Sequence, residues 1–426
     1  MAETRAPRPE GFAAYIAVTA AYWAFMLTDG ALRMLVLLHF NALGFSPVQL
    51  AYLFLLYEFM GIVTNLCAGW IAARFGLTST LYAGLGLQVI ALVALAQLDP
   101  GWAIAVSVGF VMVVQGASGV AKDLAKMSSK SAVKILAPKT NGALFRWVAL
   151  LTGSKNAVKG AGFLLGAAML TLFNFEVAVW GMAAVLALIL AAVLLFMPGG
   201  LPRSKKAAKF SEVFSKDRNV NLLCAARLFL FSARDTWFVV GIPIYFYSVL
   251  SDGSAEAQRA AFFVIGIFMA IWIIGYGAVQ AAAPGILNAR EKSLSEVVGV
   301  ARGWVRALVS IPFMLAAAAW IADGPAGWLT VLLVVGLLIF GAVFAVNSSL
   351  HSYLILAFTS AGRVTMDVGF YYMSNAAGRL LGTLLSGLSY QLGGVPLCLA
   401  VAGFMALLSW YFAATLSRSA GRLAEG

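Results

Sequence analysis

The segment PGGLPRSKKAAKFSEVFSKDRN, residues 198–219, is the longest strongly polar stretch in a chain of 426 residues. Long apolar stretches lie on both sides of it, six before it and six after it. A polar break at the centre of an apolar chain predicts a linker between two halves that are similar in build. We therefore expect an N-terminal half over 1–197, the linker over 198–219 and a C-terminal half over 220–426.

The composition places both halves in a membrane. Hydrophobic residues make up 62% of the chain, and the mean hydropathy is +0.92. A soluble fold cannot bury that much apolar surface. Apolar stretches of about 20 residues predict transmembrane helices, and the alternating segments of a β-barrel are not seen in the sequence. The expected spans are 12–38, 46–72, 79–97, 102–121, 146–172, 177–197, 221–249, 260–283, 304–322, 327–350, 368–391 and 394–416.

The net charge of +12 is explained by topology rather than by a nucleic-acid partner. Lys and Arg gather in alternate loops, such as 122–139, 203–218 and 290–306, whereas the other loops carry mainly Asp and Glu. The positive-inside rule then predicts that both termini are cytoplasmic. The three cysteines lie far apart in separate spans, so we expect no disulfide framework, no metal site and no cofactor.

Two halves of six spans, with the linker and both termini on the cytoplasmic side, describe the major facilitator architecture. In that all-α membrane fold, spans 1, 2, 4, 5, 7, 8, 10 and 11 line a central cavity, and the other four face lipid. Charges deep in the membrane provide a test, because they should face the interior of the bundle. All nine lie in spans assigned to the cavity: Asp29, Arg33, Glu58, Lys155, Lys159, Arg227, Arg234, Asp235 and Arg379.

A weak internal repeat also favours duplication of a six-span unit. An Asp recurs in the first span of each half, as Asp29 and Asp235. An Asn-Ala pair recurs in the fifth span of each half, beginning at Asn156 and at Asn375.

The deep charges are unbalanced, since six are positive and three are negative. Lys155 and Lys159 stand one helical turn apart with no acid on their own helix, and each is costly in lipid. One interpretation is that they pair across the cavity with Glu58 or Asp235. The other is that a substrate with several negative charges balances the surplus, for which Arg is well suited. The expected substrate-binding residues are Arg33, Lys155, Lys159, Arg234 and Arg379, with Asn156 and Asn375 beside them.

The acids have two possible roles. Asp29 and Arg33 are spaced i, i+4, so they can form a structural ion pair on one helix face. Arg234 and Asp235 are adjacent and point roughly 100° apart on a helix, so we expect them not to pair with each other. An intramembrane carboxylate is also a candidate for proton coupling, which applies to Asp29, Glu58 and Asp235. Glu58 ranks first because no cation lies within a turn of it on its own helix.

Residues 121–136 follow the fourth span and carry a Lys about every four residues. This pattern is typical of an amphipathic helix that lies on anionic lipid. The alternative is a basic funnel that attracts an anion from the cytosol. Lys122 and Lys126 would then form its inner rim, and we assign Arg227 to the same cytoplasmic entrance.

Three segments resemble a known family: residues 22–36 (YWAFMLTDGALRMLV), 118–128 (SGVAKDLAKMS) and 146–160 (RWVALLTGSKNAVKG). They are similar to the ArsJ-type organoarsenical efflux permeases of bacterial arsenic-resistance operons, and the likeness extends over most of the chain. The resemblance implies an inner-membrane protein with a functional link to a glyceraldehyde-3-phosphate dehydrogenase. That enzyme makes 1-arseno-3-phosphoglycerate, which the permease exports and which then hydrolyses to release arsenate.

The sequence therefore leads to a hypothesis of alternating-access export of an organic polyanion, driven by proton antiport. Residues alone indicate only a polyanion, and the arsenical comes from the resemblance. The first alternative is an organophosphate importer or phosphate-coupled exchanger with the same cationic cavity. A membrane-embedded enzyme is the second, and it is disfavoured because the sequence shows no nucleophile–base or metal-ligand pattern.

Overall fold

The computed structural model describes residues 12–75, 77–136, 143–196, 215–287, 293–359 and 364–424. In these ranges all regular structure is helical. Most of the expected linker, residues 198–214, lies outside them, so the boundaries of the two halves stay a prediction. The helices are α1 (Phe12–Ala42), α2 (Pro47–Phe75), α3 (Leu77–Leu95), α4 (Ile104–Leu136), α5 (Ala143–Leu172), α6 (Phe175–Phe196), α7 (Arg218–Thr236), the π-helix η2 (Trp237–Gly241), α8 (Ile242–Leu250), α9 (Ala255–Leu287), α10 (Leu294–Ala322), α11 (Gly327–Phe358) and α12 (Val364–Ala424).

These helices make twelve crossings in the described part of the chain. Helices α7, η2 and α8 follow one another without a break and together form the seventh span. Helix α12 contains the last two spans, because Gly393 and Gly394 leave the helical conformation between them. Gly394 has a φ of 62°, which glycine adopts without the strain that a Cβ would bring, and Pro396 follows closely.

Nine of the described helices are long and apolar enough to cross a membrane. Helix α5 and the α7–η2–α8 span do not meet that criterion. Helix α5 carries Lys155 and Lys159, and the α7–η2–α8 span carries Arg227, Arg234 and Asp235. These deep charges lower the mean hydropathy of the two spans.

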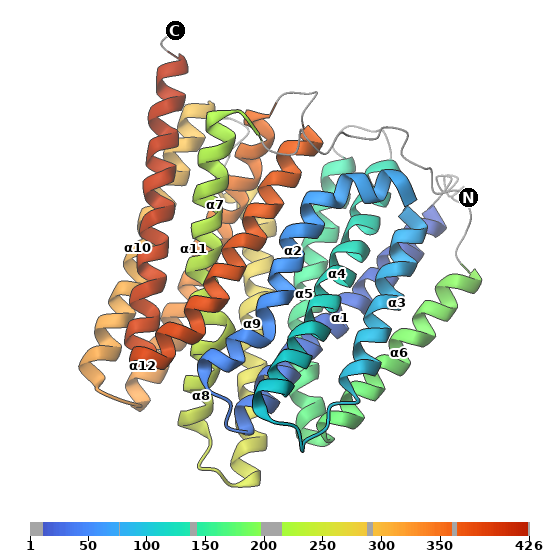
Figure 1. Cartoon of the computed structure of the whole chain (residues 1–426). Coiled ribbons are helices and arrows are strands. Elements are labelled where there is room, and N and C mark those ends of the chain that lie inside the picture. The colour runs from blue at the N-terminus through green and yellow to red at the C-terminus, as the bar shows by residue number, and fades with distance from the viewer. Residues whose placement is uncertain are drawn as a thin grey trace, which may run out of the picture.

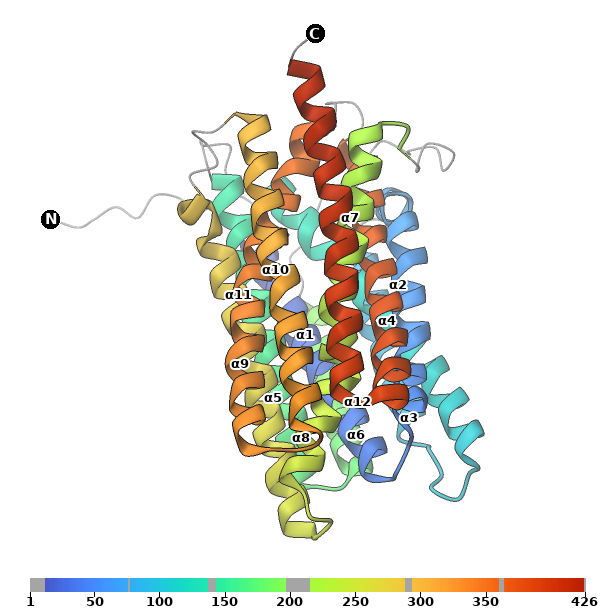
Figure 2. The ribbon, with the colours of Figure 1, turned by 90° about the vertical axis from the view of Figure 1, so that its left-hand side faces the viewer.

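The twelve spans stand side by side as one bundle (Figure 1). Helix α1 begins, and α12 ends, toward the same end of the bundle, which we call the terminal end. The opposite end, where the 43–46 and 323–326 connections lie, is the loop end. Turned by 90°, the bundle shows the two segments of α12 running next to each other from the kink at the loop end (Figure 2). We call α1–α6 the N-half and α7–α12 the C-half.

Two antiparallel helix pairs join the halves along their length, and we call them seams. In the first seam α2 packs on α12: a Cβ on Gly387 would meet Pro47 at the loop end. Farther along the same seam, a Cβ on Gly61 would lie 3.6 Å from that of Ala376. In the second seam, α5 packs on α9. A Cβ on Gly266 would meet Ala167 near the loop end, and one on Gly277 would meet Asn156 nearer the terminal end.

Each half also brings its first and fifth spans together through two glycines four residues apart. Gly162 and Gly166 of α5 lie against the α1 backbone at Leu27 and Ala31. Gly378 and Gly382 of α12 lie against the α7 backbone at Leu228 and Ser232. Small residues let membrane helices approach closely, so the halves use the same device at the same place.

The π-helix is held by side chains from the last two spans. The backbone N–H groups of Val240 and Gly241 both donate to Ser386 Oγ, at 3.1 Å each. Cys398 donates through its thiol to the Thr236 carbonyl oxygen at 3.0 Å. A π-turn is wider than an α-turn and is found often at functional sites. Here it lies one turn below Arg234 and Asp235, toward the loop end.

Candidate functional site

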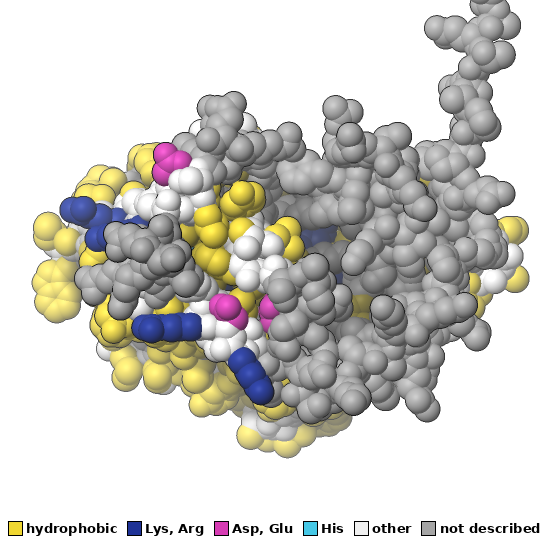
Figure 3. All heavy atoms as spheres, turned by 90° about the horizontal axis from the view of Figure 1, so that it is seen from above, with side chains coloured by type: hydrophobic (Ala, Val, Ile, Leu, Met, Phe, Trp, Pro, Cys, Tyr) yellow, Lys and Arg dark blue, Asp and Glu magenta, His cyan; other side chains and the backbone are white. Residues whose placement is uncertain are grey.

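A polar cavity of about 200 Å³ lies between the seams and is lined from both halves. Eight of its lining residues are cations and two are acids, so positive charge exceeds negative by six. Seen from the terminal end, the face is hollowed near its centre, and basic side chains are visible inside the hollow (Figure 3). The charged residues that line the cavity are Arg33, Lys122, Lys126, Lys155, Lys159, Arg227, Arg234, Arg379, Glu58 and Asp235.

The cavity narrows toward the loop end. Phe163 of α5 and Phe238 of η2 both line it, and their ring centroids lie 6.2 Å apart. Beyond them the first seam is closed, because the backbone N–H of Val48 donates to Gln391 Oε1 at 3.2 Å. These contacts close the cavity on the side of the loop end.

Glu58 is the most enclosed acid of the cavity wall, with no exposed surface. Its Oε1 accepts from Arg33 Nη2 at 3.2 Å, and its Oε2 accepts from Arg379 Nε at 2.8 Å. Arg33 belongs to the N-half and Arg379 to the C-half, so one carboxylate joins cations of both halves.

Asp29 lies behind the cavity wall and neutralises one lysine of the pair. Lys159 Nζ lies 3.2 Å from Asp29 Oδ2, and the Tyr57 hydroxyl donates to Asp29 Oδ1 at 2.5 Å. The possible pair of Asp29 with Arg33 is not formed among the described ion pairs, since Arg33 turns to Glu58 instead. We had considered Glu58 and Asp235 as partners of Lys159, but its partner in the structure is Asp29.

Arg234 and Asp235 form an ion pair, so the expectation that they do not pair is wrong. Arg234 Nε lies 2.5 Å from Asp235 Oδ1. The angle between adjacent Cβ atoms does not prevent this contact, because the Arg side chain is long enough to bend around the helix. Phe231 and Phe344 also hold the guanidinium, whose carbon lies 4.7 and 5.4 Å from their ring centroids.

Arg227 is held by neutral oxygen atoms. Its Nε donates to Asn375 Oδ1 at 2.5 Å, and its Nη1 donates to the Ser348 carbonyl oxygen at 2.9 Å. These contacts orient the guanidinium without cancelling its charge. On the opposite seam, Asn156 Nδ2 donates to Gln280 Oε1 at 3.3 Å.

The start of the 121–136 segment is buried inside the bundle, so its expected position on the membrane surface is wrong there. Lys122 is 6% exposed, and its Nζ lies 4.0 Å from the centroid of the Tyr57 ring. Asp123 is fully buried and accepts from Thr64 Oγ1 at 2.7 Å and from Lys126 Nζ at 3.1 Å. Helix α4 carries these charges into the bundle because it continues to Leu136 without a break.

Comparisons with known proteins agree on the fold. No family model matches the chain, and no curated protein matches it. Among solved structures, a POT family transporter in complex with a thioalcohol conjugated peptide is 14% identical, with a TM-score of 0.70 over 97% of this chain and 98% of that one. A POT family transporter in complex with 5-aminolevulinic acid is 15% identical, with a TM-score of 0.69 over 96% of each chain. A variant of the nucleoside transporter NupG is 15% identical, with a TM-score of 0.65 over 95% of this chain and 98% of that one.

This chain has the major facilitator fold. The prediction of twelve transmembrane helices in that fold is confirmed. The positions of the site residues follow from the facilitator arrangement, in which cavity-lining helices of the two halves face each other.

The facilitator fold brings the predicted residues into one place. All seven expected substrate-binding residues line the cavity, as do Glu58 and Asp235 among the acids. Lys122, Lys126 and Arg227, which we expected at the cytoplasmic entrance, line the same cavity. The binding, coupling and entrance roles of these residues stay predictions.

Sequence reasoning missed two residues that organise the cavity. Tyr57 contacts both Asp29 and Lys122, and nothing in its local sequence sets it apart from other aromatic residues of the spans. Asp123 was detectable, since an acid between two lysines breaks the basic pattern of 121–136 and calls for buried partners.

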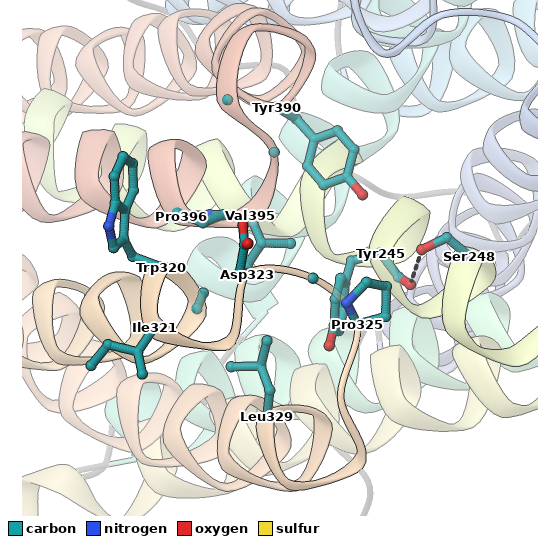
Figure 4. Close-up of a pocket in the computed structure, with 14 residues that line it drawn as sticks. Tyr245, Ser248, Trp320, Ile321, Asp323, Pro325, Leu329, Tyr390, Val395 and Pro396 are labelled. Carbon is teal, nitrogen blue, oxygen red and sulfur yellow. Dashed lines mark hydrogen bonds between the residues drawn. The ribbon is translucent and has the colours of Figure 1, made fainter.

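A second cavity, of about 770 Å³, lies at the loop end of the C-half. Tyr245, Tyr390 and Pro325 surround it, and Ser248 donates to the Tyr245 carbonyl oxygen at 2.8 Å (Figure 4). Asp323 is the only charged residue among those that line it. A cavity without a cation offers no counter-charge to an anion, so we place the candidate site in the smaller, cationic cavity.

Proposed function

We propose that this protein is a secondary active exporter of an organic polyanion. The observation that carries the proposal is the surplus of positive charge around the cavity between the halves. Cations at membrane depth are costly unless they face water, an acid or a ligand. Asp29 and Asp123 pair with Lys159 and Lys126 from outside the lining, and with them four acids face the eight cations. The surplus that remains supports a substrate with several negative charges.

The distribution of Lys and Arg supports a substrate with two anionic ends. The three cations of the C-half that line the cavity are all arginines, namely Arg227, Arg234 and Arg379. Four of the five from the N-half are lysines. Arg provides a planar fork that matches phosphate oxygens, whereas Lys acts as a point charge. An anion that engages both sets would contact both halves, as alternating access about a central site requires.

We propose 1-arseno-3-phosphoglycerate as the substrate. Its identity rests on the resemblance to the ArsJ-type permeases, and the cationic cavity is consistent with its two charged ends. On this proposal the protein lies in a bacterial inner membrane, depends on a glyceraldehyde-3-phosphate dehydrogenase for its substrate and confers arsenate resistance. Proton antiport through Glu58, Asp29 or Asp235 would drive export.

An organophosphate importer or phosphate-coupled exchanger is the second candidate. The same arginines would bind the phosphate group of such a substrate, so the cavity favours both candidates through one feature. The two differ in the direction of transport and in the need for arsenate.

Inverted membrane vesicles containing the protein provide the test. They should accumulate arsenic when the dehydrogenase, glyceraldehyde 3-phosphate, NAD and arsenate are supplied together. Omission of any one component should abolish uptake, and vesicles without the protein are the control. Accumulation from arsenate alone would contradict the organoarsenical proposal. Uptake of phosphate esters without arsenate, in exchange for internal phosphate, would favour the second candidate.

A further inference from the structure

Glu58 occupies the place where an anionic substrate would contact both halves. Its two carboxylate oxygens each accept from one guanidinium, at 3.2 Å from Arg33 and 2.8 Å from Arg379. Glu58 lines the cavity together with both arginines, and its side chain has no exposed surface. A carboxylate and a phosphate accept hydrogen bonds from the same guanidinium groups, so the two compete for one position.

The contact of Glu58 with Arg379 lies midway along the first seam. Toward the loop end of that seam, Val48 contacts Gln391, and toward the terminal end Gly61 packs against Ala376. In the second seam, the neutral side chains of Asn156 and Gln280 contact each other. The first seam therefore contains an ion pair between the halves that a ligand in the cavity can reach.

We propose that Glu58 is the resident anion of the empty site, and that an anionic group of the substrate replaces its carboxylate between Arg33 and Arg379. This exchange breaks the ion pair between α2 and α12 and loosens the first seam. The ligand class is an oxyanion with phosphate-like geometry. The inference rests on the proposed function only in requiring that the cavity binds an anion.

Repulsion between like charges explains why binding of an anion should break the ion pair between Glu58 and Arg379. If Glu58 stayed in place as a carboxylate, the incoming anion would lie beside a like charge in a poorly solvated site, which weakens binding. If Glu58 moves away, the two guanidiniums keep a full set of acceptors from the substrate. Binding energy then replaces the link that had held the halves together, and the seam is free to open.

The first test measures binding of inorganic phosphate and of 3-phosphoglycerate to the purified full-length protein by calorimetry. Glu58→Gln keeps the size of the side chain and removes the competing charge. We expect this variant to bind both probes at least about ten-fold more tightly than the original protein. Asp367→Asn is the matched control. Asp367 is also a buried acid and lies on α12, a helix of the first seam, but it does not line the cavity. The substitution should leave probe binding unchanged.

Unchanged or weaker binding by Glu58→Gln would overturn the inference, since Glu58 would then support the site rather than occupy it. If the original protein and all variants fail to bind either probe, the proposed function fails instead. If Glu58→Gln does not yield folded protein, Glu58→Asp serves. The aspartate side chain keeps the competing charge but is too short to reach both arginines. The affinity of the Glu58→Asp variant for the two probes should therefore stay within a few-fold of that of the original protein.

The second test measures the seam itself. Cysteines introduced by Val48→Cys and Gln391→Cys, in a protein whose three native cysteines are replaced by Ala, report the closed loop end through disulfide cross-linking. Phosphate should slow cross-linking several-fold when Glu58 is present. In the Glu58→Gln background, cross-linking should be slow from the start and insensitive to phosphate. A phosphate effect that persists without the Glu58 carboxylate would contradict the proposed release of the seam.

Discussion

Lys159 has two roles at the scale of the single residue. It adds positive charge to the cavity wall, and it neutralises Asp29 behind that wall at 3.2 Å. Removing the lysine therefore changes both the site and the stability of the protein. Asp29 is 4% exposed, and a buried carboxylate that loses its partner typically costs about 3 kcal/mol or more.

This double role gives a prediction that separates binding from folding. Lys159→Gln should lower the melting temperature and abolish vesicle transport. Adding Asp29→Asn should restore the melting temperature, because no buried charge is then left unpaired, but it should not restore transport. Lys216→Gln, at an exposed position, is the control and should change neither property. Transport by the double variant would remove Lys159 from the substrate site.

The pairings themselves show where prediction from sequence stops. Hydropathy and the placement of charges predicted the fold and placed nine charges in the cavity-lining spans. The partners of Glu58 and Lys159 come from other helices, so local spacing cannot identify them. Residues 121–136 were expected at the membrane surface or at the cytoplasmic entrance because a hydropathy pattern ends where charges begin. The helix continues, however, when those charges find buried partners.

At the scale of helices, the two seams depend on residues without side chains. Gly387 lets α12 approach α2 at the loop end, where a Cβ would lie 2.5 Å from the Pro47 carbonyl oxygen and 2.6 Å from Ala51 Cβ. Neither distance is tolerable, and one of the atoms belongs to the backbone. A larger side chain must therefore push the two halves apart at their closed end.

We expect Gly387→Val to destabilise the closed loop end by about 1–3 kcal/mol, as overpacking usually does. Transport should fall by about five-fold to 150-fold, since this is the rate change that such an energy implies. Gly275→Val is the control, because a Cβ there would meet no atom within 4 Å. Accessibility of a single cysteine introduced by Val48→Cys to a polar maleimide reports the opening. If Gly387→Val leaves this accessibility unchanged in an otherwise folded protein, the first seam does not control the loop end.

At the scale of the whole molecule, the cavity draws its cations from both halves. A single anionic group can lie between Arg33 and Arg379, whereas a ligand with a second anionic group at a distance can also engage Arg227. The second contact is then intramolecular, which raises affinity without any new kind of interaction. The C-half offers Arg227 for this purpose, because neutral oxygens hold it and its charge remains available.

The prediction is that 3-phosphoglycerate, which carries a carboxylate as well as a phosphate, binds more tightly than glycerol 3-phosphate, which carries only the phosphate, by about ten-fold or more. Arg227→Gln should remove most of that difference and leave glycerol 3-phosphate binding nearly unchanged. This substitution leaves no buried acid without a partner, so the protein should remain stable. Calorimetry with both ligands provides the measurement. Equal affinities in the original protein would show that the second anionic group of the ligand does not engage a cation of the cavity.

The π-helix in the seventh span has a consequence for how such a protein can change over evolutionary time. One residue more per turn than in an α-helix means that deleting a single residue from Trp237–Gly241 would restore a regular turn. The residues on either side would then keep the helix faces they have now, because the wide turn already absorbs the extra residue, so Tyr245 and Phe246 would stay in the bundle interior. The same deletion in a regular α-helical part of the span would instead rotate everything after it by about 100°. Span 7 thus contains a site at which chain length can change while Arg234 and Asp235 keep their orientation and the packing of the loop end is inherited unchanged.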